Sequence, residues 1–267
     1  MTEAPATAEP PRAAVHRGGG RLFLHQLRTE QLTFWRSRES AVFVFVFPLL
    51  LYALLGAVYS DEIDGLPAAD VLLAGILGYG CANTAFAGLA ITLVIRRESG
   101  VLKRLRATPL PSPVYLAAVL TSALVTFALQ TVSLVLLGSL LYGANVPDRP
   151  LSLAVAILVG TACFACLGLA AASLIRSAEG SSAVVNVIVL PMAFLSGAFG
   201  PTRDFPSWLQ AVADVLPLKY LIDVVEGVLL RGEPIWDDPS ALAVLAIWGA
   251  GGALLAWRRF GWEPRER

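Results

Sequence analysis

The chain has 267 residues, of which 56% are hydrophobic and 15% charged, with 20 basic and 20 acidic residues in balance. Its mean hydropathy is +0.68, whereas soluble domains usually carry about 25% charged residues. This composition excludes an ordinary soluble domain and indicates lipid as the main solvent. We expect no nucleic-acid partner.

The N-terminal region divides into two parts. Residues 1–20, rich in Ala, Pro, Gly and Arg, are predicted to form a disordered cytoplasmic tail. Residues 21–38 are predicted to form an amphipathic helix in the membrane interface, with charged residues such as Arg28 and Glu30 largely off its apolar stripe. The apolar stripe consists of Leu24, Leu27, Phe34 and Trp35.

Six long windows without Asp, Glu, Lys, Arg or His follow. A hydrocarbon core of about 30 Å needs about 20 apolar helical residues, and its backbone groups must pair within the segment. The sequence therefore predicts an all-α membrane protein with six transmembrane helices. The predicted spans are 41–59, 71–95, 114–142, 151–175, 183–200 and 241–257, with a cytoplasmic tail at 261–267.

The basic residues predict the orientation of the spans. With both termini inside, 16 of the 20 lysines and arginines fall on the cytoplasmic side. Because short cytoplasmic loops carry an excess of Lys and Arg, we expect both termini to be cytoplasmic.

Two connections differ from ordinary loops. Residues 96–108 are predicted to form a short, basic, amphipathic helix at the cytoplasmic side, which ends at Pro109 because proline lacks a backbone donor. Such a helix either acts as a lever for a partner or only fixes topology and contacts anionic lipid. The charged region 201–240 should not cross the membrane; it predicts two short re-entrant helices, split at Pro217, on the outer side.

The sequence contains no energy source for transport. Neither of its two lysines, Lys103 and Lys219, follows glycine as a P-loop requires. The six windows contain no titratable group for ion coupling apart from tyrosines and three cysteines, whose thiols inside spans act as small apolar side chains. We predict neither a catalytic site nor a metal site, and energy must come from another polypeptide if the chain is an active transporter.

Polar and aromatic side chains within the spans are the remaining candidates for a transport pathway. Most of the polar ones are expected to hydrogen-bond between helices, and Asn83 and Asn186 are the best pathway candidates. The candidate pathway residues are Asn83, Thr84, Phe86, Asn186 and Phe194.

Two motifs resemble those of the type-2 ABC transporter permeases, which are drug, antibiotic, glycolipid and polysaccharide exporters of bacteria. The first is RRESGVLKRLRATPLP from Arg96 to Pro111, and the second begins at Leu190, includes Leu195-Ser196-Gly197 and continues into the outer region. The resemblance covers about residues 21–260. In the outer region the matching residues include Trp208, Pro217 and Tyr220.

The resemblance implies a permease dimer, homo- or heteromeric, in the bacterial plasma membrane, with two copies of a separate ATP-binding subunit that hold the ATP and Mg. The basic helix would be the coupling helix, and the second and fifth spans would border the route. By resemblance, the coupling contacts would be Arg97, Glu98, Gly100, Leu102, Arg104, Leu105 and Arg106.

The expected function is ATP-driven export of a hydrophobic or amphipathic small molecule, with the drug-exporter branch the closest in its motif. Export of a polysaccharide or glycolipid by the same architecture is the alternative. An ATP-independent channel or facilitator and a non-transporting membrane scaffold are the rivals from other classes.

Overall fold

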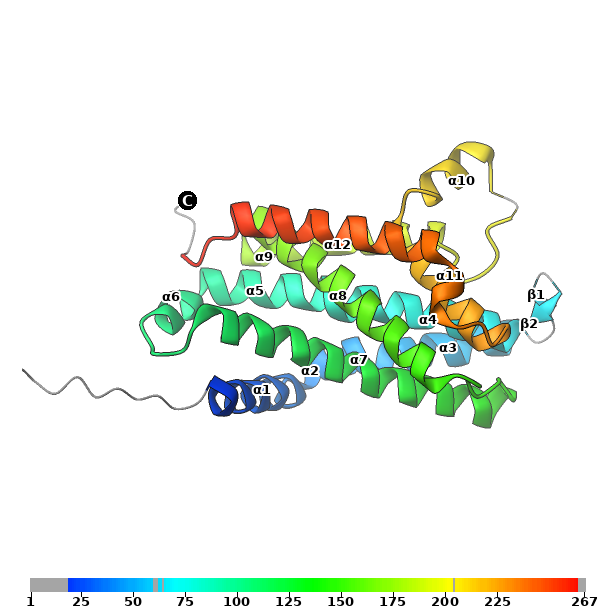
Figure 1. Cartoon of the computed structure of the whole chain (residues 1–267), viewed down its shortest axis with the longest axis horizontal. Coiled ribbons are helices and arrows are strands. Elements are labelled where there is room, and N and C mark those ends of the chain that lie inside the picture. The colour runs from blue at the N-terminus through cyan, green and yellow to red at the C-terminus, as the bar shows by residue number, and fades with distance from the viewer. Residues whose placement is uncertain (1–18, 60–61, 64, 204, 264–267) are drawn as a thin grey trace, which may run out of the picture.

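The computed structural model describes residues 19–59, 62–63, 65–203 and 205–263, and most of these are helical. Several long helices run along the long axis of the molecule (Figure 1). The helices are α1 (Gly19–Arg36), α2 (Arg38–Ala41), α3 (Phe47–Val58), α4 (Ala68–Cys81), α5 (Leu89–Glu98), α6 (Val101–Arg106), α7 (Ser112–Tyr142), α8 (Pro150–Leu174), α9 (Ala178–Leu195), α10 (Ser207–Ala213), α11 (Pro217–Leu230) and α12 (Pro239–Arg259).

Shorter elements connect them. Two π-helical segments, η1 (Val42–Val46) and η2 (Ala82–Gly88), join α2 to α3 and α4 to α5, and a 3₁₀ turn, η3 (Ile235–Asp237), precedes α12. The strands β1 (Glu62–Ile63) and β2 (Leu66–Pro67) form a small antiparallel hairpin in which Ile63 pairs with Leu66.

The prediction of an all-α membrane protein is confirmed, and the structure supplies five helices long and apolar enough to cross a membrane. The first predicted span forms a shorter apolar helix, Val42–Val58, which contains the π-helical turn η1. The five helices of spanning length are Ala68–Glu98, Ser112–Tyr142, Pro150–Leu174, Ala178–Leu195 and Pro239–Arg259.

Two helix starts differ from the sequence prediction. Helix α9 begins at Ala178, five residues before the predicted span, because Ser177 caps it by accepting a hydrogen bond from the Gly180 N–H at 3.2 Å. Avoiding the charge of Glu179 had placed the start too late. Helix α1 begins at Gly19, inside the predicted tail, and residues 1–18 of that tail lie outside the described residues.

The core is built around the helix formed by α4, η2 and α5, here called the central helix (Ala68–Glu98). Its glycines permit close packing: a methyl group at Gly75 would lie 2.6 Å from the Ala198 carbonyl oxygen, and one at Gly78 would lie 2.4 Å from Ile222. Small residues let membrane helices approach closely, where dispersion contacts replace the hydrophobic effect. The central helix is therefore held on several sides by protein.

The two ends of the bundle carry different elements (Figure 1). Helix α6, one end of α1 and the C-terminal end of α12 lie at one end, and the β-hairpin, α10 and α11 lie toward the other. Helices α10 and α11 occupy the region in which two short helices were predicted, and Pro217 is the first residue of α11, where its missing N–H costs no helical hydrogen bond. Their entry into the membrane stays a prediction.

Candidate functional site

A fixed corner joins α5 to α6. Gly100 has a φ of +71°, a left-handed conformation that favours glycine, and its N–H donates to the Arg97 carbonyl at 3.0 Å. The Gly100 carbonyl in turn accepts from the Arg104 N–H at 3.1 Å, which starts α6. The corner therefore sets the direction of α6 with two residues, Ser99 and Gly100.

Arg97 locks this corner to α8. Its guanidinium is 1% exposed and donates to the carbonyls of Ala172 at 2.8 Å and Ile175 at 2.6 Å, and its Nε forms an ion pair with Glu98 at 2.9 Å. These carbonyls belong to the last turn of α8, where they lack helical partners and where the helix dipole favours a cation. Arg97 therefore acts inside the chain.

Helix α6 has one buried side and one basic side. Leu102 is fully buried and Leu105 is half-buried against the core, so these leucines attach α6 to the bundle. Lys103, Arg104 and Arg106 are exposed. Of the predicted coupling contacts, the structure thus gives Leu102 a packing role within the chain and presents mainly basic side chains outward.

A second ion pair ties α1 to the central helix. Glu30 is the buried residue of α1, at 7% exposed, and accepts from Arg96 at 2.7 and 2.9 Å; Arg96 also donates to the Tyr115 hydroxyl at 2.9 Å. The sequence placed Glu30 largely off the apolar stripe of this helix and did not indicate that Glu30 is buried. The cause is Arg96, 66 residues further on, which supplies the charge and donors that a buried carboxylate needs.

The apolar stripe predicted for α1 faces partly outward instead. Leu24 is 63% exposed and Trp35 is 43% exposed, while Gln31 faces α7 and donates to the Ser122 hydroxyl at 2.9 Å. Polar contacts therefore hold α1 against the bundle, and its outer face is amphipathic, with exposed Arg28 as well as Leu24 and Trp35.

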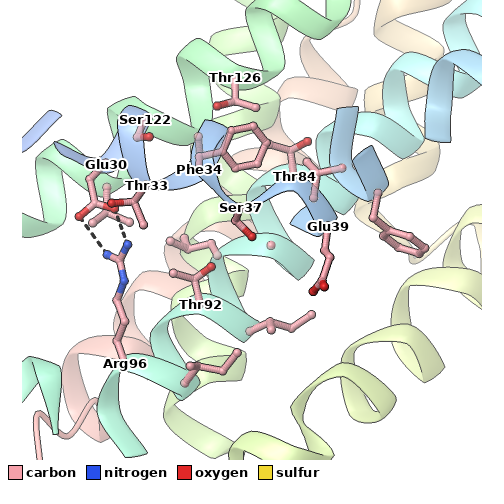
Figure 2. Close-up of a pocket in the computed structure, with 18 residues that line it drawn as sticks. Glu30, Thr33, Phe34, Ser37, Glu39, Thr84, Thr92, Arg96, Ser122 and Thr126 are labelled. Atoms are coloured by element: carbon pink, nitrogen blue, oxygen red, sulfur yellow. Dashed lines mark hydrogen bonds and ion pairs between the residues drawn. The ribbon is translucent and has the colours of Figure 1, made fainter. Parts of the chain in front are cut away.

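A pocket of about 480 Å³ lies between α1, η1, the central helix and α7 (Figure 2). The Glu30–Arg96 pair stands on one side of it, and Glu39 from α2 stands on another (Figure 2). The lining residues with polar side chains are Glu30, Thr33, Ser37, Glu39, Thr84, Thr92, Arg96, Ser122 and Thr126. Sequence patterns had not indicated it, because its walls come from segments up to about a hundred residues apart.

The predicted pathway residues do not converge on one site. Thr84 lines the pocket, whereas Asn83 and Phe86 are buried, at 4% and 7% exposed. The Asn83 Nδ2 finds no hydrogen-bond partner in the part of the chain that the structure describes. Asn186 is half-buried, and Phe194 is 59% exposed, on α9.

The three predicted outer residues lie in or beside α10 and α11. Trp208 is exposed, Pro217 is buried, and the Tyr220 hydroxyl donates to the Asp214 carbonyl at 2.7 Å. Lys219 pairs with the Asp214 carboxylate, and this hydrogen bond raises the pKa of Lys219. Tyr220 and Lys219 therefore both fasten α11 to the turn that follows α10.

Within the described ranges, no group of His, Cys, Asp or Glu side chains is arranged to hold a metal ion. The three cysteines are reduced and lie on spanning helices.

This architecture is that of a multi-pass membrane permease, in which long apolar helices carry a short basic helix at one end. The sequence model of the ABC-2 type transporter family matches residues 21–230. The chain therefore belongs to the ABC-2 type transporter family, in agreement with the resemblance of its motifs.

Individual relatives agree with this assignment. The inner membrane transport permease YhhJ of Escherichia coli (strain K12) is 26% identical over 166 residues, which are 59% of this chain and 43% of that protein. The chain thus spans less than half of that relative. The ycf38 protein of Porphyra purpurea is 28% identical over 225 residues, 82% of this chain and 76% of that protein. The linearmycin resistance permease protein LnrN of Bacillus subtilis (strain 168) is 24% identical over 218 residues, 81% of this chain and 56% of that protein.

Proposed function

We propose that the chain is the transmembrane permease subunit of an ATP-binding cassette exporter that moves a hydrophobic or amphipathic small molecule, such as a drug, an antibiotic or a lipid-like compound, out of the cell. A separate subunit would bind ATP and Mg and supply the energy. Family membership supports the permease role and a partner ATP-binding subunit, and similarity to LnrN, a linearmycin resistance permease protein, supports the class of cargo.

The proposed subunit crosses the membrane six times, with Val42–Val58 as the first and shortest span. One end of α1 and the C-terminal end of α12 lie at the same end of the molecule (Figure 1). An odd number of crossings would separate those ends, so this placement supports an even number. It also supports a common side for both termini, and the excess of basic residues predicts that this is the cytoplasmic side of a bacterial plasma membrane.

The functional unit is proposed to be a dimer of permeases above two ATP-binding subunits. Helix α9 supports the dimer because it carries large apolar side chains that its own chain leaves exposed, Val187 at 74% and Phe194 at 59%. A second permease would cover such a row, and lipid would cover it in the separate chain. Asn186 and Phe194 would then approach the route between the two permeases.

The observation that carries the proposal is that α6 has one buried apolar side and one exposed basic side. Its apolar side is held in the bundle by Leu102, and its exposed side is basic. Arg97 fastens the same corner to α8, so a force on α6 reaches two spanning helices at once. Because close-packed elements move as rigid bodies, closure of the ATP-binding subunits would rotate these helices and expose the cavity outward.

The test is charge reversal on the exposed side of α6, with Lys103→Glu, Arg104→Glu and Arg106→Glu combined. We expect this triple variant to lose the ATP-binding subunit when the tagged chain is purified from native membranes. The three substitutions remove the basic docking groups of α6 and would repel the acidic groups that bind them on the ATP-binding subunit. The buried Leu102 is unsuitable for this purpose, since Leu102→Asp would destabilise the fold itself.

The matched control is Arg258→Glu with Arg259→Glu, on exposed residues at the same end of the molecule. It should retain the ATP-binding subunit. Equal retention by both variants would remove α6 as the docking element. Solute flux through liposomes that contain only this chain would instead favour a channel or facilitator, and nearby glycosyltransferase genes would favour polysaccharide or glycolipid export.

A further inference from the structure

The pocket beside α1 contains an acidic side chain for which the described part of the chain supplies no basic partner. Its volume of about 480 Å³ falls within the range of about 300–1,000 Å³ that small-molecule sites occupy. Polar or charged side chains from α1, α2, η2, α5 and α7 line it, together with apolar side chains from α1, η1, α5 and α7 (Figure 2).

The basic group of the pocket is already satisfied. Arg96 directs Nη1 and Nη2 at both oxygens of Glu30 and reaches the Tyr115 hydroxyl as well. Glu30 is in turn 93% buried, so this pair forms a fixed wall. An anionic ligand would therefore have to displace Glu30 to reach Arg96, at a high cost in buried charge.

The pocket is lined by two carboxylates, Glu30 and Glu39, and by one basic side chain, Arg96. Glu39 lines the pocket and makes no ion pair within the described part of the chain. Hydroxyl side chains also border the space, and some of them already bond within the chain, since Ser122 and Thr126 accept from Gln31. With Glu30 paired to Arg96, the charged side chains of the lining leave one net negative charge, which suits a ligand head group that is cationic and donates N–H bonds.

The rim of the pocket is apolar and reaches the outside of the chain. Phe43 is 54% exposed and Ile95 is 48% exposed, and both belong to the lining. The neighbouring outer face of α1 also exposes apolar side chains, Leu24 and Trp35, beside basic ones such as Arg28. A ligand that places its head in the pocket would therefore run its tail along surfaces that suit lipid.

Both π-helical segments of the described chain border the pocket. η1 contributes Phe43 and Val44, and η2 contributes Thr84 and Gly88. π-helical turns lose regular hydrogen bonds and occur often at functional sites. In η1 the Val44 carbonyl accepts instead from the Gln130 side chain at 2.8 Å, so the distortion is held by a specific contact.

We propose that this pocket binds the head group of an amine-bearing amphiphile, with its ammonium at Glu39 and the surrounding hydroxyls and its chain past Phe43 and Ile95. As a step toward export this rests on the proposed function, since the occupant would be cargo held before transport. The binding itself rests only on the pocket. The amine comes either from a soluble amphiphile or from an ethanolamine lipid of the bilayer.

The experiment uses the purified full chain in phosphatidylcholine nanodiscs, without any ATP-binding subunit. A dodecylamine that carries a diazirine in its chain is photo-crosslinked, and the labelled peptides are identified by mass spectrometry. We expect saturable labelling between residues 33 and 44 and between residues 84 and 96, and at least about five-fold less from a dodecyl sulfate with the same diazirine, as one partly exposed charge contributes about 1 kcal/mol.

Three variants decide the result. Glu39→Gln should lower the labelling by about five-fold, and Thr92→Phe should fill the pocket and remove the labelling. Glu179→Gln, an exposed acid at the start of α9, is the matched control and should label as the unchanged chain does. Thermal unfolding of each variant checks that it is folded, and Glu39→Gln keeps the test valid if Thr92→Phe is not.

Nanodiscs with and without phosphatidylethanolamine distinguish a soluble amphiphile from a bilayer lipid as the source of the amine. Protection by phosphatidylethanolamine in the nanodisc would assign the site to a bilayer lipid, and labelling that this lipid does not reduce would assign it to a soluble amphiphile. Equal labelling by the amine and the sulfate, or equal labelling of Glu39→Gln and Glu179→Gln, would overturn the proposal. Since no ATP-binding subunit is present, these results do not depend on whether α6 docks one.

Discussion

The central helix (Ala68–Glu98) and α12 are both apolar enough to cross a membrane, but the protein treats them in opposite ways. In the most apolar stretch of the central helix 78% of the residues are buried inside the chain, and in that of α12 the share is 22%. The stretch of α12 is nevertheless the more hydrophobic of the two. In these two helices, hydrophobicity therefore does not follow burial within the chain.

Residue size and polarity explain the difference. The central helix carries glycines where neighbours approach closely and places Arg96 and Arg97 on protein partners at its end. Helix α12 packs mainly on α8 and turns Ile247, at 70% exposed, and Trp257, at 83% exposed, outward. In lipid, close packing and buried hydrogen bonds hold helices together, because apolar surface gains little by leaving lipid for protein.

The largest expected effect comes from Arg97→Ala in the central helix. It removes two charge-assisted hydrogen bonds to the end of α8 and leaves Glu98 without its partner, which should cost about 3–5 kcal/mol. Thermal unfolding in detergent measures this loss of stability, and the reaction of a maleimide dye with the three cysteines reports the unfolding. Arg258→Ala, at the end of α12 that lies at the same end of the molecule, should have almost no effect on stability. Equal losses of stability in Arg97→Ala and Arg258→Ala would contradict the difference between the two helices.

The next effect comes from Gly75→Ala. The added methyl group would lie 2.6 Å from a backbone oxygen of Ala198, which cannot rotate away, so we expect a loss of about 1–3 kcal/mol. Gly251→Ala on α12 is the control, since a methyl group there meets nothing within 4 Å. The same thermal assay should show no loss for Gly251→Ala, and a similar fall in both variants would contradict the packing argument.

Helix α12 has one tight contact that sharpens the comparison. At Gly252, next to the control position, a methyl group would lie 2.9 Å from the backbone of Cys166 and Leu167. We expect Gly252→Ala to cost about 1–2 kcal/mol and to change the reactivity of Cys166 toward maleimide before unfolding. If Gly251→Ala and Gly252→Ala behave alike, the contact line of α12 on α8 is misplaced.

The smallest effect is expected at the start of α12. The Asp238 carboxylate accepts from the Ser240 hydroxyl at 2.6 Å and from the Ala241 N–H at 2.9 Å, and these bonds lower the pKa of Asp238. Asp238→Ala should therefore cost about 1 kcal/mol or less above the ordinary aspartate pKa. The difference should shrink as the pH falls through the lowered pKa, because the capping carboxylate is then protonated. Asp237→Ala, at a neighbouring exposed residue, is the control and should leave the stability almost unchanged.

The helices could be predicted from the sequence more easily than their neighbours. Windows without charge located the spanning helices because lipid excludes unpaired charge over a fixed length. They could not show that η1 and η2 are π-helical or that the helix at Val42–Val58 is shorter than the others. The start of α9 was also placed late, because a capping Ser177 and a first-turn Glu179 belong to the helix despite their polarity.

The site was less predictable because its contacts join distant segments. The Leu-Lys-Arg-Leu-Arg run identified α6 and the family, but no local pattern distinguishes the buried Leu102 from the half-buried Leu105. Arg96 and Arg97 are adjacent and similar in sequence, but one binds α1 and the other binds α8. To predict the Glu30–Arg96 pair, one must know how α1 packs against the central helix. The periodicity of the 18 residues of α1 does not contain this information.

The attachment of Arg97 to the last turn of α8 also has a consequence for biosynthesis. Arg97 leaves the ribosome about 75 residues before the carbonyls that it binds at Ala172 and Ile175. Until α8 has been inserted, its guanidinium has no such acceptors and must remain hydrated at the bilayer surface. The nascent chain therefore completes this corner only when α8, the third of its helices of spanning length, has been inserted, and only then does α6 acquire a fixed orientation.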